Sequence, residues 1–482
     1  MLHSSLSVAP WLLGAAVLAQ VTAQEATSPA PGAPDEAKLL TLAEAIDDAL
    51  VRNDRLINAH ETVTQAELSV RLERSAFRPK FTPNILGSFG QTDVTNQTYR
   101  VDVSEKLVTG TELRATVGTM TESDQLGTYY NTDTTITLSQ PLLRGFGKSV
   151  TRRPLSSAEV RLADAGRARV LAEQQVAVDV ATAYYRIVGQ KEMVQVAQKT
   201  VERSRSLLDA STAKLEVGKV SQLDVFRARQ LVAQAEAQYL DSQGAVDDAM
   251  DQLRVLLRRG PDYDFQVVSE IPVTTETIEP ERAIETALAT RLELSTATEA
   301  LAEAERAADY DRNQLLPQFD LNLALTRRQV AQSFRSSFGL NKFDPALFFA
   351  VSMPVDRTAQ TIGYHSSLIE RDRRRRDIET LRRQIVEQVR RSVRQQTRLA
   401  KGLEVANASV EFAEKEVEVA TLRYQRGLSN NLDVVNAEEA LLGARSRRIS
   451  LLADMAVARL SLRAALGTLD PRHDFHPAEA QP

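Results

Sequence analysis

Hydrophobic residues recur every seven positions along the longest uninterrupted segment of the chain, Arg153 to Val217. The row consists of Val180, Ile187, Val194, Val201, Leu208 and Leu215. Small residues fill a second position of the same period, at Ala183, Ala197, Ser204 and Ser211. A sustained period of seven predicts helices that supercoil around each other, and small residues let paired helices approach closely. A helix of this extent is about 95 Å long.

Three further segments continue this period: Leu223 to Arg259, about Ser366 to Arg426, and Leu432 to Leu466. A glycine separates the members of each pair, Gly218 in the first half of the chain and Gly427 in the second. We therefore expect two antiparallel helical hairpins that turn at these glycines. Packing into a large globular bundle is the alternative, but it requires a wider hydrophobic face than these helices carry.

Two other regions alternate with a period of two. The apolar members are Phe319, Leu321, Leu323, Leu325, Leu347, Phe349 and Val351 in the second half, and Tyr99, Val101, Val103, Ile136 and Leu138 in the first. Such alternation predicts β-strands with one apolar and one polar face, within residues 81–141 and 317–356. A soluble β-sandwich also alternates, but it is not interrupted by helices of this length.

The chain contains two copies of one pattern. A shift of 238 residues aligns Pro79 with Pro317 and Asn84 with Asn322, and a shift of 209 aligns Gly218 with Gly427. The difference places about 29 extra residues in the first copy. The expected protomer is internally duplicated: a first repeat at 41–260, a linker at 261–280 and a second repeat at 281–467. The opening helices are Thr41 to Arg78 and Glu281 to Leu316, and each stops at a proline.

The two ends of the chain are expected to lie outside these repeats. Residues 1–23 resemble a signal peptide, with an apolar run of about a dozen residues and small residues before Ala23. That run is shorter than the about 20 residues of a membrane-spanning helix. Residues 24–40 are expected to form a flexible leader, and residues 468–482 a C-terminal tail.

Composition excludes several classes of function. The 482 residues are 43% hydrophobic and 26% charged, which argues against general disorder, and a net charge of -5 gives no support for nucleic-acid binding. The absence of cysteine excludes disulfides, thiolate metal sites and a cysteine nucleophile. No two histidines stand at positions i and i+4 of a predicted helix, since His473 and His476 lie in the C-terminal tail. We also find no nucleophile with a matching base, so no enzyme activity, cofactor or metal is expected. The arginine-rich run from Glu370 to Gln384 has acidic residues interleaved, and we expect it to form a solvated or inter-subunit face.

The letters GFGKS at Gly145 to Ser149 resemble the end of a phosphate-binding loop. That motif needs a glycine five positions before Gly147, and Leu142 stands there instead. We interpret the segment as a strand-to-helix joint, in which Pro141 ends the strand and Gly145 and Gly147 permit the turn. Pro354 is expected to mark the same joint in the second repeat.

Four to six strands per chain are too few to close a membrane barrel, which needs about eight. Open strand edges in lipid leave backbone groups unsatisfied, so several chains must combine their strands. Three chains with four strands each give twelve. A further hairpin suggested by Lys106 to Leu113 raises that number.

The duplicated pattern and the two tip sequences, VGKVSQLDVFRARQ and YQRGLSNNLDVVNAEEA, resemble the TolC-type outer membrane efflux protein family. The resemblance implies a mixed α and β, mostly α protomer. It also implies a homotrimer in the outer membrane of a Gram-negative bacterium, in contact with outer-membrane lipid. Its transmembrane β-barrel continues into a long periplasmic α-helical coiled-coil barrel.

By the same resemblance, the protein is a passive exit duct of a tripartite efflux or type I secretion system. The tip turns at Gly218 and Gly427 dock a periplasmic adaptor (membrane fusion) protein, which links the duct to an inner-membrane pump of the RND, ABC or MFS type. Substrate and pump class stay open. The alternative is a secreted or periplasmic coiled-coil scaffold without a channel.

The resemblance also assigns residues at the tips. Asp433 matches an aspartate ring at the pore constriction, and Asn436 stands where a second aspartate is found. Tyr424 matches a latch tyrosine and Asp224 its partner on the other hairpin. Ser429 replaces a latch arginine, which leaves the strength of that latch open.

Overall fold

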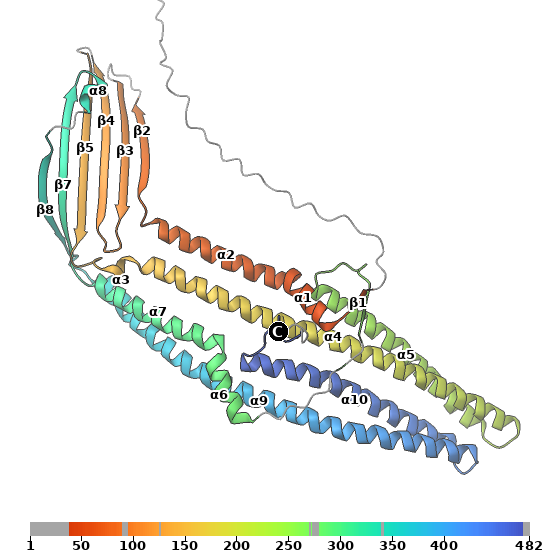
Figure 1. Ribbon diagram of the computed structural model, residues 1–482. Helices are drawn as coiled ribbons and strands as arrows, with labels where there is room; N and C mark the ends of the chain where they lie inside the picture. The colour runs from red at the N-terminus through yellow and green to blue at the C-terminus, as the bar shows by residue number, and fades with distance from the viewer. Residues whose placement is uncertain are drawn as a thin grey trace, which may run out of the picture.

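The protein is elongated, with a β-sheet at one end and long helices over the remainder (Figure 1). The computed structural model describes residues 38–88, 95–124, 127–268, 271, 279–338 and 342–475. The predicted signal peptide and residues 24–37 of the predicted leader lie outside the described residues. Among the helices that are described, none is both long and apolar enough to cross a membrane.

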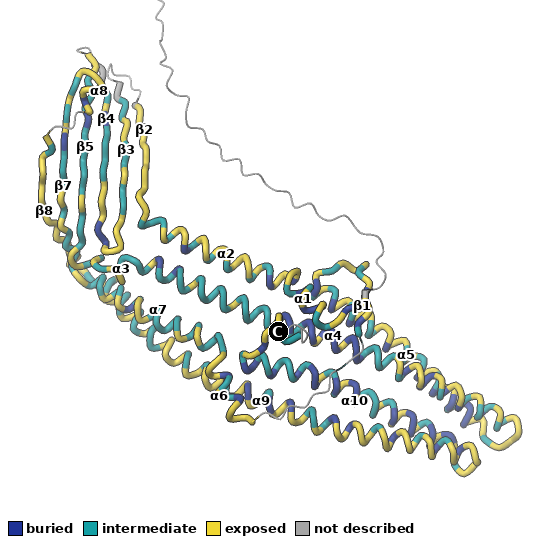
Figure 2. The backbone as a smooth tube through the Cα atoms, viewed as in Figure 1, coloured by how far each residue is buried: buried dark blue, intermediate teal, exposed yellow. Residues whose placement is uncertain are grey.

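Four long helices form the end of the molecule that lies away from the sheet. They are α4 (Arg153–Glu216), α5 (Gln222–Leu256), α9 (Thr358–Gln425) and α10 (Asn431–Leu466). They lie side by side in the order α5, α4, α10, α9 (Figure 1). The heptad rows of small and apolar residues face the neighbouring helices, so burial is concentrated in α4 and α10, and α5 and α9 form two exposed edges (Figure 2).

Each opening helix is divided in two, which differs from the expectation of one continuous helix. The pairs are α1 (Leu42–Arg52) with α2 (Asp54–Ser75), and α6 (Pro280–Thr290) with α7 (Leu292–Gln314). Asn53 and Arg291 at the breaks have extended backbones, with ψ of 129° and 122°. Asn53 also caps α2 through Arg55 N, at 3.0 Å, and donates to Leu256 O at 2.8 Å. These bonds stabilise the break, because they satisfy groups that a helix end leaves free.

The sheet has six antiparallel strands in chain order. They are β2 (Lys80–Ser88), β3 (Thr95–Lys106), β4 (Glu112–Asp124), β5 (Gly127–Pro141), β7 (Gln318–Ala331) and β8 (Asp344–Ser352). Four of these strands lie in the predicted first repeat and two in the predicted second repeat. The β3–β4 hairpin has no counterpart among the described strands of the predicted second repeat, and its length agrees with the 29 extra residues expected in the first. A short helix, α8 (Phe334–Ser337), packs against β5 and β7 near one end of the sheet.

The two faces of the sheet differ in polarity. One face pairs apolar residues across the strands, such as Val101 with Val117, Ile136 with Leu325 and Leu323 with Leu347. The other face carries polar pairs: Asp102 accepts from Asn84 Nδ2 at 2.9 Å and from Thr116 Oγ1 at 2.7 Å, and Asp133 pairs with Arg328 at 2.9 Å. The apolar face is largely exposed, with Ile85 at 75% and Phe349 at 71%.

A small two-stranded sheet, called the annex below, packs on the middle of α4. Its parallel strands are β1 (Lys38–Leu40) and β6 (Phe265–Val267), so the end of the predicted leader and part of the predicted linker are ordered strands. Tyr184 Oη lies 3.1 Å from Leu40 O and 3.2 Å from Val268 O, so its single hydroxyl hydrogen is shared between these carbonyls, and burial raises its pKa. The predicted tail also begins inside the fold, because Leu469 is buried and its carbonyl accepts from Gln174.

Candidate functional site

The two hairpin turns lie together at the end of the molecule farthest from the sheet (Figure 1). Gly218 and Gly427 have φ angles of +70° and +74°, which side chains rarely adopt, and this explains the glycine at each turn. Ser221 then caps α5, and Asn430 caps α10. The structure therefore brings both predicted tip turns to one surface.

Tyr424 of α9 links the second hairpin to the first. Its side chain is 1% exposed, and its hydroxyl lies 2.7 Å from the hydroxyl of Ser211 on α4. The Lys214 ammonium lies 3.8 Å from the centre of the Tyr424 ring and donates to the Tyr424 carbonyl. Burial lowers the pKa of Lys214, and the charge of Lys219 lowers it further. Tyr424 thus fixes the two hairpins to each other through both its hydroxyl and its ring.

Asp224, which the resemblance pairs with Tyr424, has other hydrogen-bond partners among the described residues. Its carboxylate accepts from Ser221 Oγ at 2.8 Å and from Ser221 N at 3.0 Å, as expected for a residue in the first turn of a helix. Its carbonyl accepts from Asn431 Nδ2 of α10. Asp224 therefore joins the hairpins through its backbone, and Ser211 takes the place beside Tyr424.

Two polar atoms at the tip are buried without a hydrogen-bond partner among the described residues. They are Ser429 Oγ and Asn431 Oδ1. Leaving a buried polar atom unpaired costs about 1–3 kcal/mol. The Ser429 hydroxyl, at the position where the resemblance expects a latch arginine, makes no hydrogen bond among the described residues.

An ion pair between the hairpins escaped sequence analysis. Arg203 Nε of α4 lies 2.8 Å and 2.9 Å from the two carboxylate oxygens of Glu438 on α10. Glu438 is only 4% exposed. One sequence feature could have indicated this ion pair: a carboxylate between Val434 and Leu441, on the otherwise apolar face of α10.

Asp433 and Asn436 are exposed and one helical turn apart on α10. The buried residues Val434 and Ala437 hold α10 against its neighbours, so Asp433 and Asn436 project from the opposite side. The structure brings these two predicted constriction residues to one surface beside the tip. It places them apart from the Tyr424 contacts, which are buried.

The predicted joint lies at the base of the sheet. Pro141 is the last residue of β5, and short helix α3 (Lys148–Thr151) precedes α4. Gly145 N donates to Asn313 Oδ1 at 2.8 Å, and Gly147 N donates to Thr109 O at 3.2 Å. Pro354 lies between β8 and α9. The glycine amides therefore connect the joint to α7 and to the β3–β4 turn.

Within the described residues, no group of three or more His, Asp or Glu side chains is arranged to hold a metal ion.

Comparison with known proteins identifies a matching family. The family model described as "Outer membrane efflux protein" matches residues 45–257 and 283–468, one segment in each repeat. A curated relative is the fusaric acid resistance protein FusA of Burkholderia cepacia, 27% identical over 199 residues. That match spans 41% of this chain and 33% of the relative, so the chain covers about a third of that protein's length.

Solved outer membrane channels share the fold. The CmeC channel of Campylobacter jejuni has a TM-score of 0.69 at 15% identity, over 90% of this chain and 87% of that one. VceC of Vibrio cholerae has a TM-score of 0.70 at 18% identity, over 88% and 96%. The open state of MtrE of Neisseria gonorrhoeae has a TM-score of 0.64 at 18% identity, over 88% of both chains.

Proposed function

Because the chain belongs to the outer membrane efflux protein family, we propose that it forms a homotrimeric exit duct in the outer membrane of a Gram-negative bacterium. The duct conducts substrates passively, and an inner-membrane pump delivers them through a periplasmic adaptor. The trimer is supported by one observation: the exposed residues of α5 and α9, the two edge helices of the helical layer, are complementary to each other.

Each edge helix carries exposed apolar residues at intervals of seven. On α9 these are Val405, Phe412 and Val419, which are 69%, 66% and 55% exposed. On α5 they are Phe226 and Leu240, at 53% and 65%. A heptad row exposed in one chain is typical of a helix that lacks its coiled-coil partner.

The two rows correspond when the residues are counted from the tips. Val419 and Phe226 lie eight residues from their turn glycines, Phe412 and Ala233 lie 15, and Val405 and Leu240 lie 22. At 29 residues the apolar pairs give way to Arg398 on α9 and Asp247 on α5. The two helices run in opposite directions, so α9 of one copy fits α5 of the next with apolar groups together and opposite charges together.

The sheet gives a second reason for assembly. Its apolar face is exposed, and its edge strands β2 and β8 have no neighbour on one side within the described residues. Three copies combine eighteen strands into one barrel, which removes the open edges that lipid does not tolerate. The polar face then lines the bore.

The tips provide the docking surface for the adaptor, around Gly218 and Gly427, and the constriction of the duct. Three copies of Asp433, with Asn436 one turn away, form a ring that favours cations. The contacts of Tyr424 and Glu438 hold each second hairpin against the first, and thereby keep the ring narrow.

The pump is of the RND, ABC or MFS type, and both efflux and type I secretion use such a duct. The partial match to a fusaric acid resistance protein makes a small organic acid the first cargo to test.

Membrane fractionation and planar-bilayer recording test the proposal. The protein is expected to fractionate with outer membranes, to run as a trimer after detergent extraction, and to conduct ions in a bilayer. A protein released as a monomer without detergent, and silent in bilayers, is the coiled-coil scaffold instead.

A further inference from the structure

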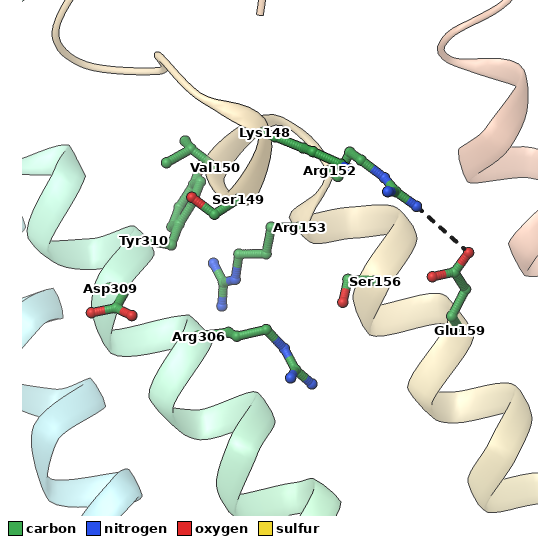
Figure 3. A pocket seen from close by; sticks show the side chains of 10 residues that line it. All are labelled: Lys148, Ser149, Val150, Arg152, Arg153, Ser156, Glu159, Arg306, Asp309 and Tyr310. Atoms are coloured by element: carbon green, nitrogen blue, oxygen red, sulfur yellow. Dashed lines mark ion pairs between the residues drawn. The ribbon is translucent and has the colours of Figure 1, made fainter. Parts of the chain in front are cut away.

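A cavity of about 530 Å³ lies at the base of the sheet, between α3, the start of α4, and α7 (Figure 3). Four of its lining residues are basic: Lys148, Arg152, Arg153 and Arg306. Two are acidic, Glu159 and Asp309. The cavity adjoins the GFGKS segment, whose lysine the proposed function leaves without a role.

The carboxylates do not neutralise all four cations. Glu159 lies 4.0 Å from Arg152 and 3.8 Å from Arg74, outside the cavity. Arg306 is held 2.9 Å from Glu303, a neighbour on α7. Among the described residues, no ion pair joins Asp309 to Arg153 or Arg306 (Figure 3). Among the described residues, no carboxylate lies within 4 Å of the Lys148 or Arg153 side-chain nitrogens.

Arg153 is positioned but incompletely bonded. Its guanidinium lies 4.4 Å from the centre of the Tyr310 ring, which fixes its direction. Its Nε is buried and has no hydrogen-bond partner among the described residues. Figure 3 shows the Arg153 guanidinium directed into the space between α4 and α7, toward the side of Arg306. A guanidinium that is held in place by an aromatic ring and has no carboxylate partner suits a phosphate, which accepts two parallel bonds from one arginine.

The surroundings of the cavity suit a lipid. It lies at the base of the sheet, and the nearby loop between β5 and α3 exposes Leu142, Leu143 and Phe146. Apolar side chains next to basic ones match the boundary between acyl chains and headgroups.

We propose that this cavity binds a phosphate group, supplied by the headgroup of a phospholipid in the leaflet next to the helices. Lys148 and Arg153 hold the phosphate, and the apolar loop contacts the acyl chains. The lipid source rests on the proposed function, because a membrane around the sheet brings phospholipid to the joint.

Native mass spectrometry of the detergent-extracted protein tests the site with two lipids that share their acyl chains. Phosphatidic acid carries a phosphate, and diacylglycerol does not. We expect the unmodified protein to bind phosphatidic acid at least about tenfold more tightly, since each charge-assisted bond contributes substantially. The double variant Lys148→Gln/Arg153→Gln is expected to lose that preference. The control Arg282→Gln/Arg335→Gln removes two exposed charges elsewhere and keeps it.

The single variant Lys148→Glu, at the exposed rim, tests the site without disturbing Arg153 and is expected to weaken binding several-fold. Equal affinity for both lipids, or equal loss in the control, overturns the proposal. Displacement of phosphatidic acid by an equal concentration of inorganic phosphate identifies a free-phosphate site and overturns the lipid assignment. Conductance is recorded on the same samples, so that the two proposals fail separately. A conducting trimer that does not prefer phosphatidic acid refutes only the phosphate site. A non-conducting protein that does prefer phosphatidic acid refutes only the duct.

Discussion

Arg203 on α4 contacts both carboxylate oxygens of Glu438 on α10, and Glu438 is almost completely buried between the hairpins. A buried ion pair of this kind stabilises one relative position of the two hairpins, because a shift that separates the pair leaves a buried charge without its partner. It lies on the tip half of the molecule, where the duct is proposed to open.

Glu438→Gln is expected to loosen the closed tip. The amide keeps the shape of the side chain but exchanges charge-assisted bonds for neutral ones, a loss of about 1–2 kcal/mol. Mean conductance in planar bilayers should rise several-fold. Glu439→Gln, on the adjacent exposed residue, is the matched control and should leave the conductance unchanged; a rise in both variants contradicts the assignment.

Tyr424→Phe and Ser211→Ala test the second bond between the hairpins. Each variant removes one of the two hydroxyls and leaves the other buried without a partner, at a cost of about 1–3 kcal/mol. Because both changes remove the same bond, the double variant should open the tip little more than either single variant. Additive effects on conductance show instead that the two hydroxyls act independently.

Asp433→Ala is expected to reduce the preference of the duct for cations, because three carboxylates leave the constriction together. Reversal potentials in a salt gradient measure the preference. Asp209→Ala removes an exposed aspartate from α4 in the same half of the molecule and should not change it. Unchanged selectivity in Asp433→Ala places the constriction elsewhere.

Arg398→Asp should weaken the trimer, since it sets two negative charges together where α9 meets α5 of the next copy. Asp247→Arg should do the same, and combining the two reversals should restore assembly. Size-exclusion chromatography with light scattering reports the oligomeric state. Arg282→Asp serves as a control for charge reversal alone. If the double variant is no better than the singles, the register counted from the tips is wrong.

Gly145→Leu should impair assembly, because Gly145 has φ of +85° and its amide bonds Asn313 across the joint. Gly260→Leu, at an exposed glycine with open space around it and no positive φ, is the matched control and should leave the trimer intact. The yield of trimer from membranes distinguishes the two variants. An equal loss of trimer in both variants, or in neither, contradicts a specific role for the Gly145 turn.

The periodic parts of the fold were accessible from sequence. The row from Val180 to Leu215 lies in one helix, α4, and the alternation around Leu323 lies in strand β7. Both patterns depend on local geometry, since a helix or strand repeats its faces at a fixed interval. The breaks at Asn53 and Arg291 were missed because the bonds that stabilise them, such as Asn53 to Leu256, come from segments far away in the chain.

Specific contacts at the tip were harder to predict. The resemblance identified Tyr424 but not the residue that its hydroxyl contacts. Asp224 and Ser211 are both small polar residues near Gly218, the turn of the first hairpin, and only the packing of α9 on α4 distinguishes them. The pair Arg203 and Glu438 has no local signature beyond one charge in an apolar row. The annex was missed for a similar reason, because strands of three residues carry too little pattern.

The β3–β4 hairpin, present only in the first repeat, sets the width of the sheet. Six strands spaced by about 4.8 Å and tilted by about 40° span about 38 Å, whereas four strands span about 25 Å. The four helices that continue below the sheet, α2, α4, α7 and α9, span about 40 Å at about 10 Å each. In the proposed trimer the two parts of the wall therefore have nearly the same circumference. Over the described residues, cargo that has passed the tips therefore meets a β-wall about as wide as the helical wall, which leaves discrimination by size to the periplasmic end.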